Sequence, residues 1–137
     1  MEINYRNLSV DKFTSPCPVV VDEDTSIEEV LNIMKDNAVR HVPVTKAGKL
    51  VGILSERDLK VVAHLDYAKN CTASEIMVEN PYSVNEHTTL EEVAFEMSSQ
   101  KIGSAIVTDK EGNISGIFTS IDGLNALIEV LRGEILT

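Results

Sequence analysis

Leu50-Val-Gly-Ile-Leu-Ser-Glu-Arg-Asp58 is repeated as Ile114-Ser-Gly-Ile-Phe-Thr-Ser-Ile-Asp122, 64 residues further along the chain. Each copy reads as an apolar strand with one glycine, followed by a hydroxyl residue and then an aspartate. A Ser or Thr with Asp three positions later is typical of a helix start, where the hydroxyl caps the helix and the carboxylate lies in the first turn. The free N–H groups of such a start can bind a phosphate, and the carboxylate can accept hydrogen bonds from sugar hydroxyls. For a single copy, a simple capping pair would be the more common interpretation.

The whole chain shows the same internal repeat, and this is the most informative feature of the sequence. Before the second hairpin turn the offset is 63 residues, and one extra residue in that turn raises it to 64. The matching pieces are Thr25-x-x-Glu-Glu-Val30 with Thr88-x-x-Glu-Glu-Val93, Val44-Thr45 with Val107-Thr108, and Gly52 with Gly116. We therefore expect an α/β (α+β) fold of two β-α-β-β-α repeats, packed as a pseudo-twofold pair that buries an apolar face of each short sheet.

The first repeat predicts its elements most clearly. They are a strand over 19–21, a helix capped by Thr25, a strand over 39–44, a hairpin turn over 46–48, a strand over 50–54, a helix from Ser55 to about Ala63, and a connector over 64–73. Glu28 would complete a capping box with Thr25. The apolar face of the first helix would consist of Ile27, Val30, Leu31 and Met34. Pro43 predicts an edge or irregular position for its strand.

Composition limits the classes of function. With 137 residues and 43% hydrophobic residues the chain can build a core without metal or disulfide, and Cys17 and Cys71 lack the spacing of a redox or zinc site. No signal sequence and no run of about 18 apolar residues is present, which predicts a cytoplasmic protein. The formal charge of −10 disfavours nucleic acid and anionic membranes as partners, so an anionic ligand would need a local group of donors.

Taken together, these pieces resemble the cystathionine-beta-synthase (CBS) domain family, arranged as a tandem pair or Bateman module. The most specific pieces are Asp24-Thr-Ser-Ile-Glu-Glu-Val30, Val39-Arg-His-Val-Pro-Val44 and Gly52-Ile-Leu-Ser-Glu-Arg-Asp58. The resemblance predicts one CBS repeat over residues 8–66 and another over 72–132. It implies a regulatory module, without catalytic activity, cofactor or metal, that binds an adenine nucleotide or adenosyl compound such as AMP, ADP, ATP or S-adenosylmethionine in two clefts between the repeats.

The resemblance also implies which residues line the clefts, because the family builds each cleft crosswise from both repeats. The first cleft would contain Thr14, Val19, Val39, Arg40, His41, Ile117, Thr119 and Asp122. Asp122 would accept the ribose hydroxyls, Thr119 would bind a phosphate, Arg40 and His41 would offset its charge, and Ile117 would lie against the base. The second cleft would contain Ser55, Arg57, Asp58, Tyr82, Ile102, Gly103 and Ser104. Gly103-Ser104 replaces Arg-His there, so Arg57, with Lys101, would supply the positive charge.

Two other interpretations compete with ligand sensing. One is a purely structural pairing module with empty clefts, in which Arg40 and His41 are surface residues. The other is an enzyme, which the sequence disfavours because its paired carboxylates lie at helix starts, where they favour the helix dipole, and because no catalytic motif is present. A homodimer is expected from apolar residues on the helices after Ser55 and Thr119, namely Leu59, Val62, Leu65, Leu124, Leu127, Ile128 and Leu131. The ligand, the dimer orientation and any regulated protein partner stay open.

Overall fold

The computed structural model describes residues 4–17, 19–65 and 70–135. These residues form two compact units, one drawn from Met1–Cys17 with Tyr82–Thr137 and the other from Pro18–Pro81. Each unit contains a four-stranded sheet together with helices, which confirms the expected mixed α+β fold class. The limits 8–66 and 72–132 of the two sequence repeats stay a prediction, since the compact units divide the chain at other places.

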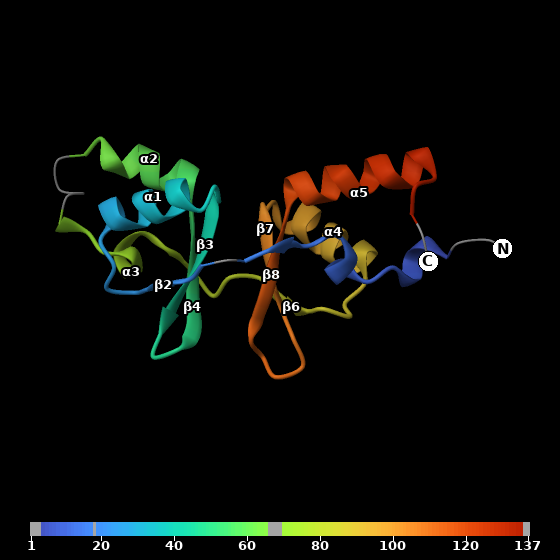
Figure 1. Ribbon diagram of the computed structural model, residues 1–137, viewed down its shortest axis with the longest axis horizontal. Helices are drawn as coiled ribbons and strands as arrows, with labels where there is room; N and C mark the ends of the chain where they lie inside the picture. The colour runs from blue at the N-terminus through green and yellow to red at the C-terminus, as the bar shows by residue number, and fades with distance from the viewer. Residues whose placement is uncertain (1–3, 18, 66–69, 136–137) are drawn as a thin grey trace. The chain divides into compact units, whose positions relative to one another are not determined.

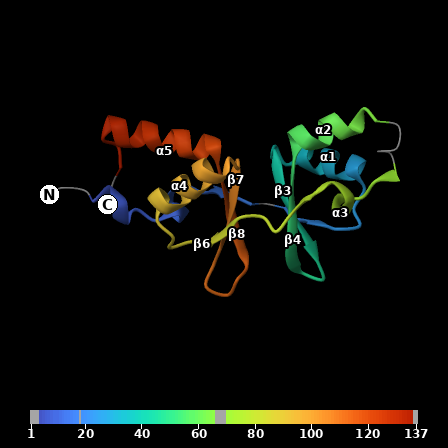
Figure 2. The same cartoon turned by 180° about the vertical axis from the view of Figure 1, so that it is seen from behind.

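The unit of the first repeat follows the predicted element order. Its elements are β2 (Val21–Asp22), α1 (Ile27–Asp36), β3 (His41–Lys46), β4 (Lys49–Ser55), α2 (Glu56–Ala63), α3 (Ala73–Ile76) and β5 (Val78–Glu79). The sheet order is β2-β3-β4-β5, with β2 parallel to β3 and the other pairs antiparallel. Figures 1 and 2 both show α1 and α2 on the same face of this sheet. The predicted β-α-β-β-α order is therefore present in this unit.

The unit of the second repeat has the same plan. Its elements are η1 (Tyr5–Asn7), η2 (Val10–Phe13), β1 (Ser15–Pro16), β6 (Ser83–Asn85), α4 (Leu90–Gln100), β7 (Ser104–Thr108), β8 (Ile114–Thr119) and α5 (Ser120–Arg132). The sheet order is β1-β8-β7-β6, with α4 and α5 on one face (Figures 1 and 2). An irregularity lies between Val107 and Thr108, and β3 has one between Val44 and Thr45. These positions match in the sequence repeat, so the repeat extends to a local distortion of the sheet.

The fourth strand of each sheet comes from the N-terminal part of the other sequence repeat. β1 lies near the start of the first repeat but pairs with β8, and β5 lies near the start of the second repeat but pairs with β4. A glycine allows each close passage. A Cβ on Gly116 would lie 2.6 Å from the Ser15 carbonyl oxygen, and one on Gly52 would lie 3.0 Å from that of Val78. The repeated glycine of the quoted stretch thus has a packing role, because it lets a neighbouring backbone cross the strand.

The first helix begins one residue later than predicted. Ser26 caps α1 by accepting a hydrogen bond from the Glu29 N–H at 3.2 Å, so the prediction that Thr25 is the cap was wrong. Thr25 instead uses its backbone outside the helix, where its carbonyl accepts from the Ala73 N–H at 2.7 Å. The predicted connector over 64–73 therefore ends in a segment that docks against the start of α1. Its residues 66–69 lie outside the described part of the chain.

Pro43 lies in an interior strand, since β3 is flanked by β2 and β4. The Thr45 carbonyl accepts from the Glu23 N–H at 2.9 Å, so alternate residues of β3 direct their backbone groups toward β2. Pro43, two residues earlier, occupies such a position just before the pairing with β2 starts at Val44. Because Pro43 lies outside the paired residues of β2 and β3, its missing N–H removes no hydrogen bond between these two strands. The irregular position predicted from Pro43 is present, because the register of β3 shifts at the next residue pair.

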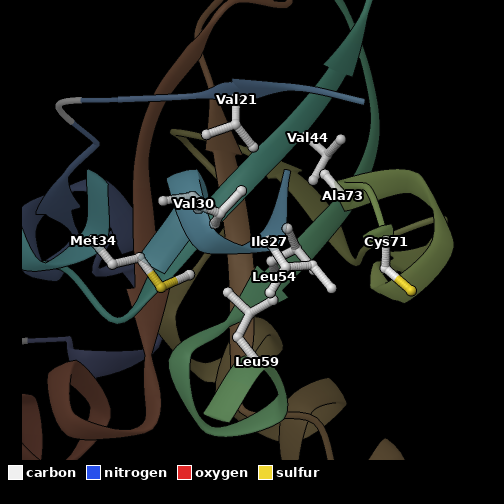
Figure 3. Close-up of a cluster of buried hydrophobic side chains, with 10 residues drawn as sticks. Val21, Ile27, Val30, Met34, Val44, Leu54, Leu59, Cys71 and Ala73 are labelled. Carbon is white, nitrogen blue, oxygen red and sulfur yellow. The ribbon is translucent and has the colours of Figure 1, made fainter. Parts of the chain in front are cut away.

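Each unit has its own hydrophobic core between sheet and helices. In the first repeat, Ile27, Val30 and Met34 of α1 are buried against the sheet, as the apolar face of the helix predicts. Figure 3 shows these side chains around Leu54 and Leu59, with Cys71 and Ala73 closing one side. In the second repeat the core is formed by Val10, Val84, Val93, Met97, Ala105, Val107 and Phe118. Val10 ties the N-terminal segment to the second repeat through this core.

Leu59 is fully buried, so it does not contribute to an exposed apolar face on α2. The expectation that Leu59 takes part in such a face was wrong, because the side chain fills the core between α1 and the sheet. Helix α5 differs, because Ile121, Leu124, Leu127, Ile128 and Leu131 are all exposed. Within the described residues, no helix combines the length and the apolar character needed to cross a membrane.

We expect Gly116→Ala to lower the free energy of unfolding by about 1–3 kcal/mol, because the new methyl group would collide with the backbone of β1. Gly123→Ala is the matched control within α5. Its Cβ would lie 3.7 Å from the Phe118 ring, an ordinary contact, so better helix propensity should raise stability by about 0.5–1 kcal/mol. Urea denaturation of the two variants measures both changes. Equal effects would show that the close passage of β1 does not constrain residue 116.

Candidate ligand-binding sites at two helix starts

The start of α2 gathers the polar residues of the first repeat. Ser55 caps the helix by accepting a hydrogen bond from the Asp58 N–H at 3.2 Å. The Arg40 carbonyl accepts from the Glu56 N–H at 2.8 Å, and His41 is paired with Ser55 across β3 and β4. Arg57 and Asp58 are exposed in the first turn. One end of this unit thus carries two arginines and a histidine next to an exposed helix N-terminus.

His41 is half-buried in this arrangement. Burial lowers the pKa of His41 from its usual 6.5, and the Asp58 carboxylate opposes that shift. The imidazole therefore binds a proton less readily than an exposed one unless an anion comes close to it. A phosphate at the helix start would supply such an anion.

His41, Ser55 and Asp58 are the residue types of a hydrolytic triad, but the described contacts do not join them as one. Ser55 accepts the hydrogen bond of a helix cap, and no hydrogen bond between His41 and Ser55 is present in the described part of the chain. A triad needs the histidine in hydrogen-bond contact with the nucleophile. The arrangement is suited to binding an anion through the positive charge of Arg40 and Arg57 and the positive end of the α2 dipole.

The start of α5 is built on the same backbone plan with a closed hydrogen-bond ring. Asp122 is only 9% exposed, and its Oδ2 accepts hydrogen bonds from the Thr119 N–H at 2.9 Å and the Thr119 hydroxyl at 3.2 Å. Its Oδ1 accepts from the Ser15 hydroxyl at 2.8 Å. The Thr119 hydroxyl in turn accepts from the Asp122 N–H at 3.4 Å, which completes a capping box. This ring fixes a carboxylate that is nearly buried.

The second helix start carries no basic pair. The Gly103 carbonyl accepts from the Ser120 N–H at 3.1 Å, as the Arg40 carbonyl does in the first repeat, and Ser104 is paired with Thr119. The equivalent positions are thus Arg40-His41 in one unit and Gly103-Ser104 in the other. The backbone is repeated, whereas the charge is not.

The structure places each predicted site residue within one of the two units. The unit of the first repeat contains Val19, Val39, Arg40, His41, Ser55, Arg57 and Asp58, and that of the second contains Thr14, Tyr82, Ile102, Gly103, Ser104, Ile117, Thr119 and Asp122. Within each unit, the helix-capping hydroxyl residue is paired with the first residue of β3 or β7 of the same repeat, His41 with Ser55 and Ser104 with Thr119. The crosswise assignment of these residues to two clefts stays a prediction.

Ser15 is the residue that sequence reasoning missed. The predicted neighbour of Asp122 was Thr14, but the Thr14 hydroxyl donates to the Val10 carbonyl at 2.7 Å. Ser15, the next residue, makes the contact with Asp122. Both residues have a hydroxyl, and β1 is only two residues long, so no strand periodicity in the sequence could show which side chain points toward α5.

Among the residues that the structure describes, no three His, Cys, Asp or Glu side chains gather in a group that could hold a metal ion. The features present at both helix starts are hydroxyls, a carboxylate and the positive end of a helix dipole. Such groups suit a phosphate and a sugar.

Comparison with known proteins agrees with this geometry. The chain is 39% identical over 107 residues to inosine-5'-monophosphate dehydrogenase of Aquifex aeolicus, a match that spans 77% of the chain but only 21% of that enzyme. The crystal structure of CBSX2 of Arabidopsis thaliana in complex with AMP is 25% identical with a TM-score of 0.75, covering 91% of this chain and 99% of CBSX2. The CBS domain pair of protein MJ0100, in complex with 5-methylthioadenosine and S-adenosyl-L-methionine, is 27% identical with a TM-score of 0.75, covering 93% and 98% of the two chains.

The family model described as CBS domain matches the chain twice, at residues 10–64 and 73–129. Each match contains one strand, helix, strand, strand, helix unit and one of the two helix starts. With the repeated sequence, the repeated fold and the similar solved structures, this shows that the chain belongs to the CBS domain family as a tandem CBS pair.

Proposed function

We propose that this CBS pair is a regulatory module that senses an adenine nucleotide or adenosyl compound, of the class of AMP, ADP, ATP or S-adenosylmethionine, in clefts between its repeats. The observation that carries this proposal is the ring around Asp122, a nearly buried carboxylate at the start of a helix. Solved CBS pairs in complex with AMP and with S-adenosyl-L-methionine support the ligand class. The proposed role is binding, with no catalytic step.

The chemistry of the ring suits a nucleoside. A ribose offers hydroxyl donors, and the Asp122 carboxylate is an acceptor that needs no further proton to bind them. The first turn of α5 favours a phosphate through the positive end of the helix dipole, while its Ser120 and Asp122 N–H groups donate to the Gly103 carbonyl and the Thr119 hydroxyl. The buried Ile117, two residues before the Thr119 cap, is an apolar neighbour for a base.

In the first proposed cleft, Asp122 and Thr119 bind the ribose and a phosphate, while Arg40 and His41 of the other repeat neutralise phosphate charge. Val19, Val39 and Thr14 complete this cleft. In the second, Ser55 and Asp58 take the same roles, with Arg57 as the cation and with Tyr82, Ile102, Gly103 and Ser104 as neighbours. Arg40 and His41 make the first cleft the better site for a polyanionic nucleotide.

We also propose a homodimer that forms through α5. Five large apolar side chains of this helix are exposed, which is unusual for a helix that faces only water. The sequence pattern assigned Leu59 of α2 to the same role, but that side chain is in the core. The proposed interface is therefore centred on α5, and twofold symmetry would let the same apolar face cover itself.

An adenine nucleotide should raise the melting temperature of the protein, because it binds the folded chain only. At about 100 times the dissociation constant, one bound ligand adds about 2.7 kcal/mol to the free energy of unfolding. A thermal-shift screen with adenosine, AMP, ADP, ATP and S-adenosylmethionine measures this stabilisation. Shifts within error for all five compounds would favour the structural pairing module with empty clefts.

Two substitutions assign the roles within the proposed cleft. Asp122→Asn should weaken adenosine and AMP by a similar factor of about tenfold to a hundredfold, because it removes the charge that accepts the ribose. Arg40→Ala should weaken ATP much more than adenosine, and Lys35→Ala, an exposed cation at the end of α1, serves as its control. Equal losses for adenosine and ATP in Arg40→Ala would mean that Arg40 does not contact phosphate.

AMP affinity should depend on pH through His41. The pKa of His41 in the free protein is lowered from 6.5, chiefly by burial, and a bound phosphate would raise it. The affinity should thus be highest below the free-state pKa, on the acid side of 6.5, and should fall as the pH rises toward the bound-state pKa. Calorimetric titrations over pH, with adenosine as the ligand lacking phosphate, test this. His41→Gln should flatten the profile, whereas His87→Gln, an exposed histidine, should leave it unchanged.

Light scattering at protein concentrations of tens of micromolar should give the mass of a dimer, and Leu127→Glu should give a monomer because a charge would be buried in the α5 face. Phe95→Glu is the matched control, since Phe95 is 64% exposed on α4. A monomeric unaltered protein would contradict the proposed dimer. Dissociation by Phe95→Glu but not by Leu127→Glu would move the interface away from α5.

A further inference from the structure

We propose that the Ser15 hydroxyl competes with one ribose hydroxyl for the Asp122 carboxylate, because its hydrogen bond uses a lone pair that the ribose diol needs. Ser15 would thereby reduce the preference of this site for ribose over deoxyribose. The inference rests on the proposed function, because it assumes that Asp122 accepts hydrogen bonds from the sugar. It goes beyond that function in assigning a specificity role to a residue of the N-terminal segment. Ser15 lies 107 positions before Asp122 in the chain.

The hydrogen bonds of Asp122 leave little room for a sugar. A carboxylate has about four acceptor positions, two on each oxygen. On Oδ2, both are taken by the Thr119 N–H at 2.9 Å and the Thr119 hydroxyl at 3.2 Å. On Oδ1, one is taken by the Ser15 hydroxyl at 2.8 Å. One position therefore remains, whereas the two hydroxyls of a ribose need two.

Ser15 is the donor that can leave at the smallest cost. The Thr119 N–H is part of the backbone of the helix cap, and the Thr119 hydroxyl also accepts from the Asp122 N–H, so neither donor can turn away without opening the capping box of α5. A nucleoside has no phosphate that would compete for the Thr119 hydroxyl. Ser15 is exposed, so a rotation about its Cα–Cβ bond moves the hydroxyl into solvent. Its backbone stays in place, because β1 pairs with β8 through Ser15 and Ile117. A ribose that binds with both hydroxyls thus replaces one protein hydrogen bond with one of its own.

This exchange predicts how removal of the hydroxyl acts on different sugars. In Ser15→Ala both positions on Oδ1 are open, so adenosine gains its second hydrogen bond without displacing a protein donor. A deoxynucleoside has one hydroxyl on this diol, and the open position serves it equally well in both proteins. We expect Ser15→Ala to bind adenosine about threefold to tenfold more tightly, with 2'-deoxyadenosine and 3'-deoxyadenosine unchanged.

Calorimetric titration of adenosine and its two deoxy forms against the unaltered protein and Ser15→Ala tests the inference. Ser115→Ala is the matched control, since it removes an exposed hydroxyl of β8 that donates to the Val107 carbonyl and lies outside the proposed site. Ser15→Thr keeps a hydroxyl and should keep the unaltered discrimination. As a second readout, Ser15→Ala should melt below the unaltered protein without ligand, and this difference should shrink at saturating adenosine.

The outcomes separate this inference from the proposed function. A larger preference for adenosine in Ser15→Ala, absent in Ser115→Ala and Ser15→Thr, supports it. Adenosine binding with the same preference in all four proteins, or weaker adenosine binding in Ser15→Ala, overturns it while leaving the proposed function intact. Failure of all three nucleosides and of AMP to bind the unaltered protein overturns the proposed function, and this inference with it.

Discussion

The rest of this structure depends on two close contacts, in each of which the backbone of a neighbouring strand packs directly against a glycine. Gly116 lets the Ser15 carbonyl come closer than any side chain would permit, and Gly52 does the same for Val78. Each sheet thereby gains a fourth strand from the N-terminal part of the other sequence repeat. The same passage brings Ser15 within 2.8 Å of Asp122. A contact required by packing thus also completes the polar ring at the start of α5.

The two repeats show how one backbone plan can carry two chemistries. In both, the strand β4 or β8 ends in a hydroxyl residue that caps the following helix, and the carbonyl of the residue just before β3 or β7 accepts from the first N–H of that helix. In the first repeat, arginine and histidine stand beside this start and the aspartate is exposed. In the second, the aspartate is nearly buried and is surrounded by hydroxyls. The positive charge beside the start of α2 suits an anion, whereas the fixed Asp122 carboxylate at the start of α5 suits a sugar.

A nucleotide contains both an anionic phosphate and a sugar, so the proposed ligand would use both kinds of helix start. The proposed sensing role requires in addition that binding changes something a partner can detect. The Ser15 contact is one such point, since it links the N-terminal segment to the carboxylate on which a ligand would act. The exposed apolar face of α5 is another, because it belongs to the helix whose first turn contains Asp122. Ligand and partner surfaces would then share one helix.

The sequence by itself determined the repeat, the order of strands and helices, the apolar face of α1 and the two helix starts, because these follow from local periodicity and capping. The tertiary structure alone decided the contacts between distant segments. Ser26, and not Thr25, caps α1, because the Thr25 carbonyl accepts a hydrogen bond from the Ala73 N–H outside the helix. Leu59 is buried, although its spacing resembles that of an exposed stripe. Ser15, and not Thr14, reaches Asp122 because the pairing of β1 with β8 sets which side chain faces α5. No local pattern records such pairings, because they depend on which segments meet when the chain folds.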